Sequence, residues 1–132
     1  MSREYLLDTH VWLWSLLEPD RLRNKTKALL TAPDSTLWLS PISVWETTML
    51  AGHGRLDLDT DARGWVQDAI TASGIGEAAL NNEVALQSRE LKLKHDDPAD
   101  RFIAATASVY QLTLVTADER LLRGKGYDAI RG

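Results

Sequence analysis

Short apolar runs alternate with longer amphipathic segments along nearly the whole chain, and this alternation constrains the fold more than any other feature. Three runs have the character of buried strands, at 4–8, 36–40 and 112–116, and two weaker ones lie at 75–80 and 127–130. Helices are predicted between them, at 9–17, 24–32, 41–51, 59–74, 81–91, 98–111 and 118–124. Strands alternating with helices predict the α/β class, as a three-layer α/β/α sandwich with a mostly parallel central sheet.

Local signals at the ends of helices support this reading. Ser40 and Pro41 form an N-cap followed by proline at the first helical position. Asp97 precedes Pro98 in the same way and places Asp100 at the third helical position, which is close to a capping box. We therefore expect helices to begin at residues 41 and 98.

Length and composition fit one globular domain that spans residues 1–132. The chain has 132 residues, of which 44% are hydrophobic and 26% are charged. It has no cysteine, which excludes disulfides and thiolate metal sites. No apolar run approaches the roughly 20 residues of a membrane span, and the N-terminus lacks the layout of a signal peptide, so we expect a cytoplasmic protein without membrane contact.

Four acidic residues fall where the sheet of an α/β fold binds ligands, beyond the carboxyl ends of its strands. Asp8 ends the first strand, Glu46 follows the second, and Asp100 and Asp118 flank the 112–116 strand. Two carboxylates about 4 Å apart repel by about 4 kcal/mol at an effective dielectric near ~20. A cluster of four therefore needs protonation or a cation, and oxygen ligands without cysteine favour Mg²⁺ or Mn²⁺ over zinc.

Structural roles compete with metal binding for several of these residues. Asp97 is well placed to cap the helix at 98, and Asp8 and Asp118 are each placed to cap the helix that follows. Asp96 reads as a solvated loop acid. Glu46 reads either as a site residue or as a solvent-facing helix residue at the border of an apolar stripe, which consists of Ile42, Trp45 and Met49.

Four segments resemble the PIN-domain family, and within it the VapC-type toxins of toxin–antitoxin pairs. They are "YLLDTHVWLW", "LSPISVWETTML", "HDDPADRFIAATA" and "LTLVTADERL", which occur in the family's order from position 4 to about 122. The first and third are specific when found together. The resemblance implies an α/β/α sandwich that acts as a Mg²⁺- or Mn²⁺-dependent endoribonuclease, the toxin of a type II toxin–antitoxin system.

The resemblance also implies roles for individual residues. The family's four metal-binding and catalytic acids match Asp8, Glu46, Asp100 and Asp118, its hydroxyl residue near the last acid matches Thr116, and its small polar residue after the first acid matches Thr9. Asp97 belongs to the "DPxDR" form of the third motif, as a helix cap or a further metal contact. Ala99 departs from the family, whose members often carry a bulky apolar residue there, and this departure concerns packing.

The resemblance further implies an RNA substrate, a cognate antitoxin that packs an amphipathic segment near the site, and a homodimer. The helix at 11–17 is a candidate partner surface, with ordinary core as the alternative. A net charge of -4 requires a local basic surface or a metal for nucleic-acid binding. Candidate basic positions for an RNA track are 21–27, Lys92, Lys94, Arg101 and 119–126, although Arg101 is also placed to pair with a site acid.

Tryptophan and histidine positions give weaker expectations. Trp38 and Trp45 are predicted to lie in the core. Trp12 and Trp14 are two positions apart and cannot share a helix face, so one is expected near the surface. The histidines have no metal-ligand spacing and are expected in loop or capping roles; they are His10, His53 and His95.

Other functions use similar folds. A receiver domain needs paired acids after the first strand, whereas Asp8 is followed by Thr9. A "DxDxT" phosphatase is disfavoured because position 10 is histidine. A non-catalytic nucleic-acid- or protein-binding module and a structure-specific DNA nuclease remain as alternatives, which a metal titration and competition between RNA and DNA would separate.

Overall fold

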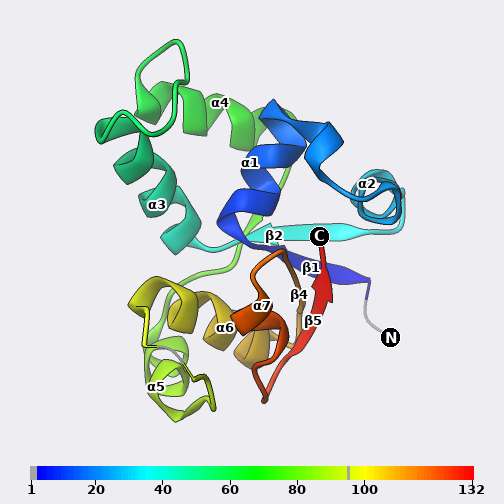
Figure 1. The fold of residues 1–132 in the computed structure, drawn as a ribbon, viewed down its shortest axis with the longest axis vertical. Helices are drawn as coiled ribbons and strands as arrows, with labels where there is room; N and C mark the ends of the chain where they lie inside the picture. Colours follow the sequence, from blue (N-terminus) through cyan, green and yellow to red (C-terminus); the bar gives the residue numbers. More distant parts are fainter. Residues whose placement is uncertain (1–2, 95) are drawn as a thin grey trace.

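A five-stranded sheet forms the centre of the computed structural model, which describes residues 3–94 and 96–132 (Figure 1). The strands are β1 (Glu4–Leu7), β2 (Thr36–Leu39), β3 (Gly76–Glu77), β4 (Thr113–Thr116) and β5 (Asp128–Arg131), in the order β3-β2-β1-β4-β5. Every neighbouring pair in this sheet is parallel. The predicted parallel sheet is therefore confirmed, together with its two weaker strands.

The helices lie close to their predicted ranges. They are α1 (Thr9–Leu17), α2 (Asn24–Thr31), α3 (Pro41–Gly52), α4 (Ala62–Ser73), α5 (Asn82–Glu90), α6 (Pro98–Tyr110) and α7 (Glu119–Leu122). A short 3-10 turn, η1 (Pro19–Arg21), was not predicted. Helix α4 begins three residues later than expected, because Asp59 has a left-handed φ of 61° and Asp61 accepts the capping hydrogen bond of Gly64. Within the described residues, no helix has the length and apolar character needed to cross a membrane.

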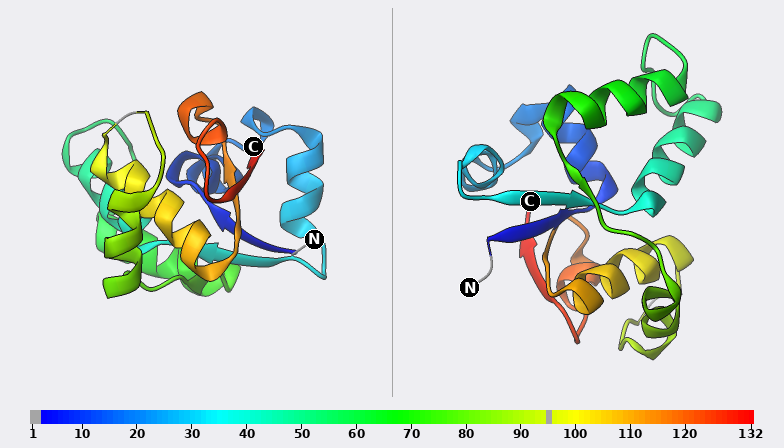
Figure 2. Two further views of the ribbon diagram at one scale, coloured as in Figure 1. Left: turned by 90° about the horizontal axis from the view of Figure 1, so that it is seen from below. Right: turned by 180° about the vertical axis from the view of Figure 1, so that it is seen from behind.

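The helices form layers on the two faces of the sheet (Figures 1 and 2). Side chains of β1 alternate between them: Tyr5 and Leu7 pack with α1 and its neighbours, and Leu6 packs with α5 and α6. Val115 and Leu114 of β4 divide in the same way. The three-layer α/β/α sandwich predicted from the sequence is thus confirmed.

Helix α3 corrects one prediction about the core. Trp45 is 54% exposed, so it does not lie in the predicted apolar stripe. The buried side chains of α3 are instead Ser43 and Thr47, whose small size allows close packing and whose hydroxyls are hydrogen-bonded. Trp38 is half-buried and packs against the core as expected.

The strand order creates a crevice at the carboxyl ends of β1 and β4. The chain runs from β1 to β2 on one side, and β4 later pairs with the other side of β1. The backbone N–H of Asp8 donates to the carbonyl of Val115 at 2.9 Å, which carries the pairing one residue past β1. Ligands of parallel α/β sheets bind at such a switch point, so the residues that follow β1 and β4 are placed at the expected site.

Candidate active site

Asp8 lies between β1 and α1, and it is only 8% exposed. Its Oδ1 accepts a hydrogen bond from the backbone N–H of Thr9 at 2.9 Å, and its Oδ2 accepts one from the Thr116 hydroxyl at 2.7 Å. Burial raises the pKa of Asp8 above its ordinary value, and the two hydrogen bonds offset only part of this rise. The carboxylate therefore caps α1, and a nearby cation would stabilise its ionised form.

Thr116, the last residue of β4, connects two of the acidic positions. Its fully buried hydroxyl donates to Asp8 and accepts a hydrogen bond from the backbone N–H of Asp118 at 3.1 Å. A single side chain thus fixes the Asp8 carboxylate and the start of the turn that carries Asp118. Valine at this position would have nearly the same shape, but it could neither donate a hydrogen bond to Asp8 nor accept one from Asp118.

Glu46 projects from α3 and is held by the residue next to Asp8. The Thr9 hydroxyl donates to Oε1 of Glu46 at 2.6 Å, and it lies 2.9 Å from the hydroxyl of Ser43. The pKa of Glu46 is raised above its ordinary value, mainly by burial and also by the negative charge of Asp8. The hydrogen bond from Thr9 lowers this pKa, but by less than burial raises it. The site therefore gathers carboxylates whose ionisation is mutually unfavourable.

Asp97 and Asp100 lie at the start of α6. Oδ1 of Asp97 accepts a hydrogen bond from the backbone N–H of Asp100 at 3.2 Å, and Pro98 occupies the first helical position between them. Asp97 is thus the helix cap, as the sequence indicated. The Asp100 side chain is 15% exposed. Asp100 is the third residue of α6 and therefore lies in its first turn.

Asp118 caps α7 and is paired with an arginine. Its Oδ1 accepts a hydrogen bond from the backbone N–H of Arg120 at 2.8 Å, and its Oδ2 lies 3.3 Å from the guanidinium of Arg120. Burial alone would raise the pKa of Asp118, but the hydrogen bonds and charge of Arg120 outweigh it and hold that pKa below its ordinary value. The same guanidinium lies 3.8 Å from Oδ2 of Asp100.

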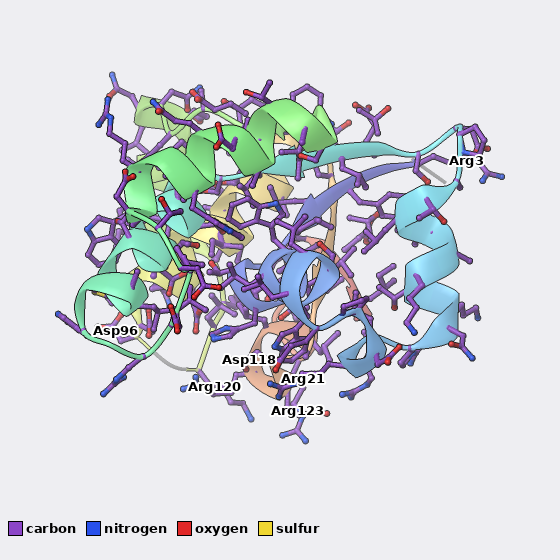
Figure 3. The ribbon with its side chains drawn as sticks, turned by 90° about the horizontal axis from the view of Figure 1, so that it is seen from above. Arg3, Arg21, Asp96, Asp118, Arg120 and Arg123 are labelled. Atoms are coloured by element: carbon purple, nitrogen blue, oxygen red, sulfur yellow. The ribbon has the colours of Figure 1, made fainter. Side chains whose placement is uncertain are left out.

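These acids surround one pocket of about 570 Å³. The acidic pocket is lined by Asp8, Glu46, Asp97, Asp100 and Asp118, together with His10, Trp14, Arg21, Ala117 and Arg120. Figure 3 shows the labelled members Arg21, Asp118 and Arg120 grouped together. The structure therefore brings together acids from four distant segments of the chain, beside the Thr9 and Thr116 hydroxyls that orient two of them.

The donor chemistry of the acidic pocket suits a hard divalent cation. Its five acids offer carboxylate oxygens, which Mg²⁺ and Mn²⁺ prefer, and among the described residues His10 is the one imidazole in its lining. Within the described residues, no three acidic or histidine side chains are already drawn to metal-ligand spacing. The acids are nevertheless already in contact with a cation of the protein itself, since the Arg120 guanidinium lies between Asp100 and Asp118.

Several residues differ from their predicted roles. Arg101 is 7% exposed and donates hydrogen bonds to the carbonyls of Ser88 and Leu91 at 2.9 Å, so it holds the α5–α6 connection and is not displayed to RNA. His10 belongs to α1 and lines the acidic pocket, whereas His53 caps α3 as expected. The prediction for His95 falls outside the described residues.

The arginines of the acidic pocket were not assigned to it from the sequence. Arg21 and Arg120 belong to segments that were predicted as candidates for an RNA track, and nothing in a single sequence places them beside particular acids. The guanidinium of Arg21 lies 4.3 Å from the centre of the Trp14 ring. Trp12 is buried and Trp14 is half-buried, which agrees with the expected division between their two helix faces.

A larger groove of about 760 Å³ adjoins the acidic pocket and shares His10, Trp14 and Arg21 with it. Its other lining residues are Leu13, Leu17, Glu18, Leu50, Arg55, Leu56 and Asp57. Leu16 and Leu17 on α1 are 40% and 41% exposed. The groove, which we call the α1 groove, is lined by apolar and charged side chains in similar measure, and it ends directly at the acids.

The chain is similar to known proteins in sequence as well as in fold. The family model described as "PIN domain" matches residues 5–126. The chain is 35% identical over 119 residues to "Ribonuclease VapC22" from Mycobacterium tuberculosis, with 88% of each chain covered.

Solved structures share the fold at lower identity. A VapBC2 structure from Rickettsia felis bound to a promoter DNA fragment superposes with a TM-score of 0.73 at 16% identity, over 97% of this chain and 98% of that one. VapBC-5 from Mycobacterium tuberculosis, a member of the VapBC family of toxin–antitoxin systems, gives a TM-score of 0.61 at 17% identity, over 99% and 100%.

Proposed function

The chain belongs to the PIN-domain family, and from this premise we propose that it is a metal-dependent endoribonuclease and the toxin of a type II toxin–antitoxin pair. One observation carries the proposal: Asp8, Glu46, Asp100 and Asp118, although far apart in sequence, line one pocket at the switch point of the sheet. The relative at 35% identity carries the name ribonuclease, which supports RNA as the substrate.

Asp8 and Asp100 are the proposed direct ligands of Mg²⁺ or Mn²⁺, with Glu46 and Asp118 as ligands directly or through water. The ion would supply an activated water and would offset negative charge on the scissile phosphate. Asp97 is already used as a helix cap through Oδ1, so we place it outside the direct ligands.

The hydroxyls of the site position the carboxylates. Thr116 donates to Oδ2 of Asp8 and keeps this carboxylate in one orientation. Thr9 donates to Oε1 of Glu46, and within the described residues Oε2 accepts no hydrogen bond. We therefore assign Glu46 to orient the attacking water, because one of its oxygens is fixed and the other is available.

An antitoxin is the proposed partner of the α1 groove. The solved structures that share the fold include a toxin–antitoxin complex and a member of the VapBC family of toxin–antitoxin systems. The α1 groove presents the exposed Leu17 and the half-buried Leu50 and Leu56 beside the acidic pocket, so an amphipathic segment laid into it would cover the entrance to the acids. We also propose, from the family alone, that the chain forms a homodimer.

Cleavage of RNA by the purified protein tests the enzyme proposal. We expect cleavage with Mg²⁺ or Mn²⁺, none with EDTA, and none by Asp8→Asn, while Asp68→Asn on the exposed side of α4 keeps full activity. An active, folded Asp8→Asn would overturn the site assignment. Metal binding without cleavage would favour a binding module, and preferential cleavage of DNA in competition would favour a DNA nuclease.

A further inference from the structure

A second pocket, of about 340 Å³, adjoins the acidic pocket and shares Arg120 with it. We call it the basic pocket. It is lined by Lys92, Leu93, Lys94, Arg120, Arg123, Gly124 and Lys125. Five of these seven residues are cationic and none is acidic. The charge of the surface therefore changes from negative in the acidic pocket to positive in the basic pocket, on the two sides of Arg120. Figure 3 shows Arg120 and Arg123 projecting from this region.

Backbone and packing contacts hold the two basic segments of this pocket together. The segments are 92–94 and 120–125, which are distant in sequence. The N–H of Lys125 donates to the carbonyl of Lys92 at 3.5 Å, in an isolated antiparallel bridge. A Cβ on Gly124 would lie 2.5 Å from Leu93 Cδ2 and would also collide with the Tyr127 hydroxyl. The two segments are therefore closely packed at Gly124, and this packing keeps their cations near one another.

Among the described residues, four of the five cations of the basic pocket have no acidic partner, and the fifth, Arg120, pairs with Asp118 and Asp100. Outside the pocket some cations pair with acids, as in Arg3 with Asp34 at 3.0 Å and Lys27 with Asp20 at 3.1 Å, and the unpaired ones do not gather in one pocket with four others. In the part of the chain that the structure describes, no ion pair involves Lys92, Lys94, Arg123 or Lys125. On a chain with a net charge of -4, this concentration of free positive charge marks a surface suited to a polyanion.

We propose that the basic pocket binds the phosphate backbone of single-stranded RNA next to the bond that is cleaved, an inference that rests on the proposed function. Arg120 makes the two pockets continuous, so a strand with one phosphate at the acids has its neighbours among the cations. Among the residues that the structure describes, no aromatic side chain lines the basic pocket. It therefore contacts phosphates and does not stack on bases, which makes its contribution independent of base sequence.

Direct RNA binding tests this proposal without relying on cleavage. The affinity of a short, unstructured, fluorescently labelled RNA is measured by anisotropy in EDTA, at several salt concentrations. Arg123→Ala with Lys125→Ala removes two pocket cations and leaves Arg120 in place. We expect binding about tenfold weaker, and a slope of log affinity against log salt that is reduced by about 1.4, since each single-strand phosphate contact contributes about 0.7.

Matched variants separate charge from folding. Arg3→Ala with Arg63→Ala removes two exposed cations outside the pocket and outside the candidate RNA track, and it is expected to bind RNA like the wild type. Arg123→Lys with Lys125→Arg keeps the charges and is expected to retain affinity. Unchanged RNA binding by Arg123→Ala with Lys125→Ala would overturn the inference. If this variant lost affinity only for the antitoxin, the pocket would be assigned to an acidic peptide and the inference would also be overturned.

The outcomes also distinguish this inference from the proposed function. If the wild type binds RNA through these cations but never cleaves it with Mg²⁺ or Mn²⁺, the enzyme proposal fails and the binding surface stands. If the wild type cleaves RNA and the alanine pair binds and cleaves equally well, the surface fails and the enzyme proposal stands.

Discussion

The hydroxyl of Thr116 donates a hydrogen bond to Oδ2 of Asp8 at 2.7 Å, across 108 positions of sequence. This bond joins the ends of β1 and β4 inside the acidic pocket. Because Thr116 is fully buried and also accepts from the backbone of Asp118, it orients two proposed metal-binding residues without itself carrying charge.

Thr116→Val is expected to lower the rate of RNA cleavage by about 10- to 100-fold, since residues that orient metal ligands have effects of that size. The change leaves a buried oxygen of Asp8 without its donor, at a cost of about 1–3 kcal/mol in the free energy of unfolding. Kinetics and urea denaturation would measure the two effects. Thr113→Val in the same strand is the control, and equal activities of the two variants would contradict the positioning role.

Asp8→Asn is expected to raise the melting temperature in EDTA. The pKa of Asp8 is raised in the folded protein, so ionisation costs more there than in the unfolded chain. The free energy of unfolding therefore falls as the pH rises above the ordinary value of 3.8, and it stays lower above the folded-state pKa. Asparagine keeps the helix cap without a charge.

Thermal melts with and without Mg²⁺ would check this. Added Mg²⁺ should stabilise the wild type and the surface control Asp68→Asn, and it should leave Asp8→Asn unchanged. A lower melting temperature for Asp8→Asn than for the wild type in EDTA would contradict the predicted penalty.

Arg120→Gln is expected to strengthen Mn²⁺ binding by about two- to fivefold. Its guanidinium lies 3.3 Å from Asp118 and 3.8 Å from Asp100, where it competes with a bound cation, and exposed ion pairs of this kind are weak, so the expected effect is small. Isothermal titration would give the dissociation constants. Arg123→Gln is the control, because Arg123 pairs with no acid among the described residues, and it should bind Mn²⁺ like the wild type. Weaker Mn²⁺ binding by Arg120→Gln would refute the competition between Arg120 and the metal ion.

Trp45→Ala is expected to change the free energy of unfolding by less than about 1 kcal/mol, because the side chain is 54% exposed. Trp12→Ala is expected to cost about 3–5 kcal/mol, because Trp12 is 1% exposed and packs against Trp65. Guanidinium denaturation compares the two tryptophans directly. Similar losses would show that Trp45 packs inward in solution.

Leu17→Arg is expected to weaken neutralisation by the cognate antitoxin about tenfold or more while RNA cleavage continues. Leu17 lines the α1 groove and is 41% exposed, so a charge there would disrupt an apolar contact. Growth of cells that co-express toxin and antitoxin would report the effect. The control is Leu86→Arg, at an exposed leucine of α5, and equal neutralisation of both variants would place the antitoxin elsewhere.

Local chemistry explains why the elements could be predicted from the sequence. Ser40 with Pro41 and Asp97 with Pro98 start helices through contacts within three residues, and β1 and β4 follow from short apolar runs. The convergence of the four acids followed from strand ends sharing one edge of a parallel sheet. Their chemical roles remain proposals.

Contacts between distant segments explain what could not be predicted. The apolar spacing on α3 suggested that Trp45 is buried, but packing against the Thr9 hydroxyl selected Ser43 for the interior. Arg101 carries the same charge as Arg123, and only the fold shows that one is enclosed among carbonyls and the other is exposed. A single sequence contains the residue types but not these neighbours.

The position of β1 at the middle of the sheet has a consequence during translation. Asp8 is synthesised early, but its partner Thr116 is added 108 residues later, and β1 has no β4 to pair with until then. We therefore expect the nascent polypeptide to remain harmless while most of it is still being made. The ribosome and its own messenger would be exposed to a finished toxin only after the β4 segment has emerged from the exit tunnel.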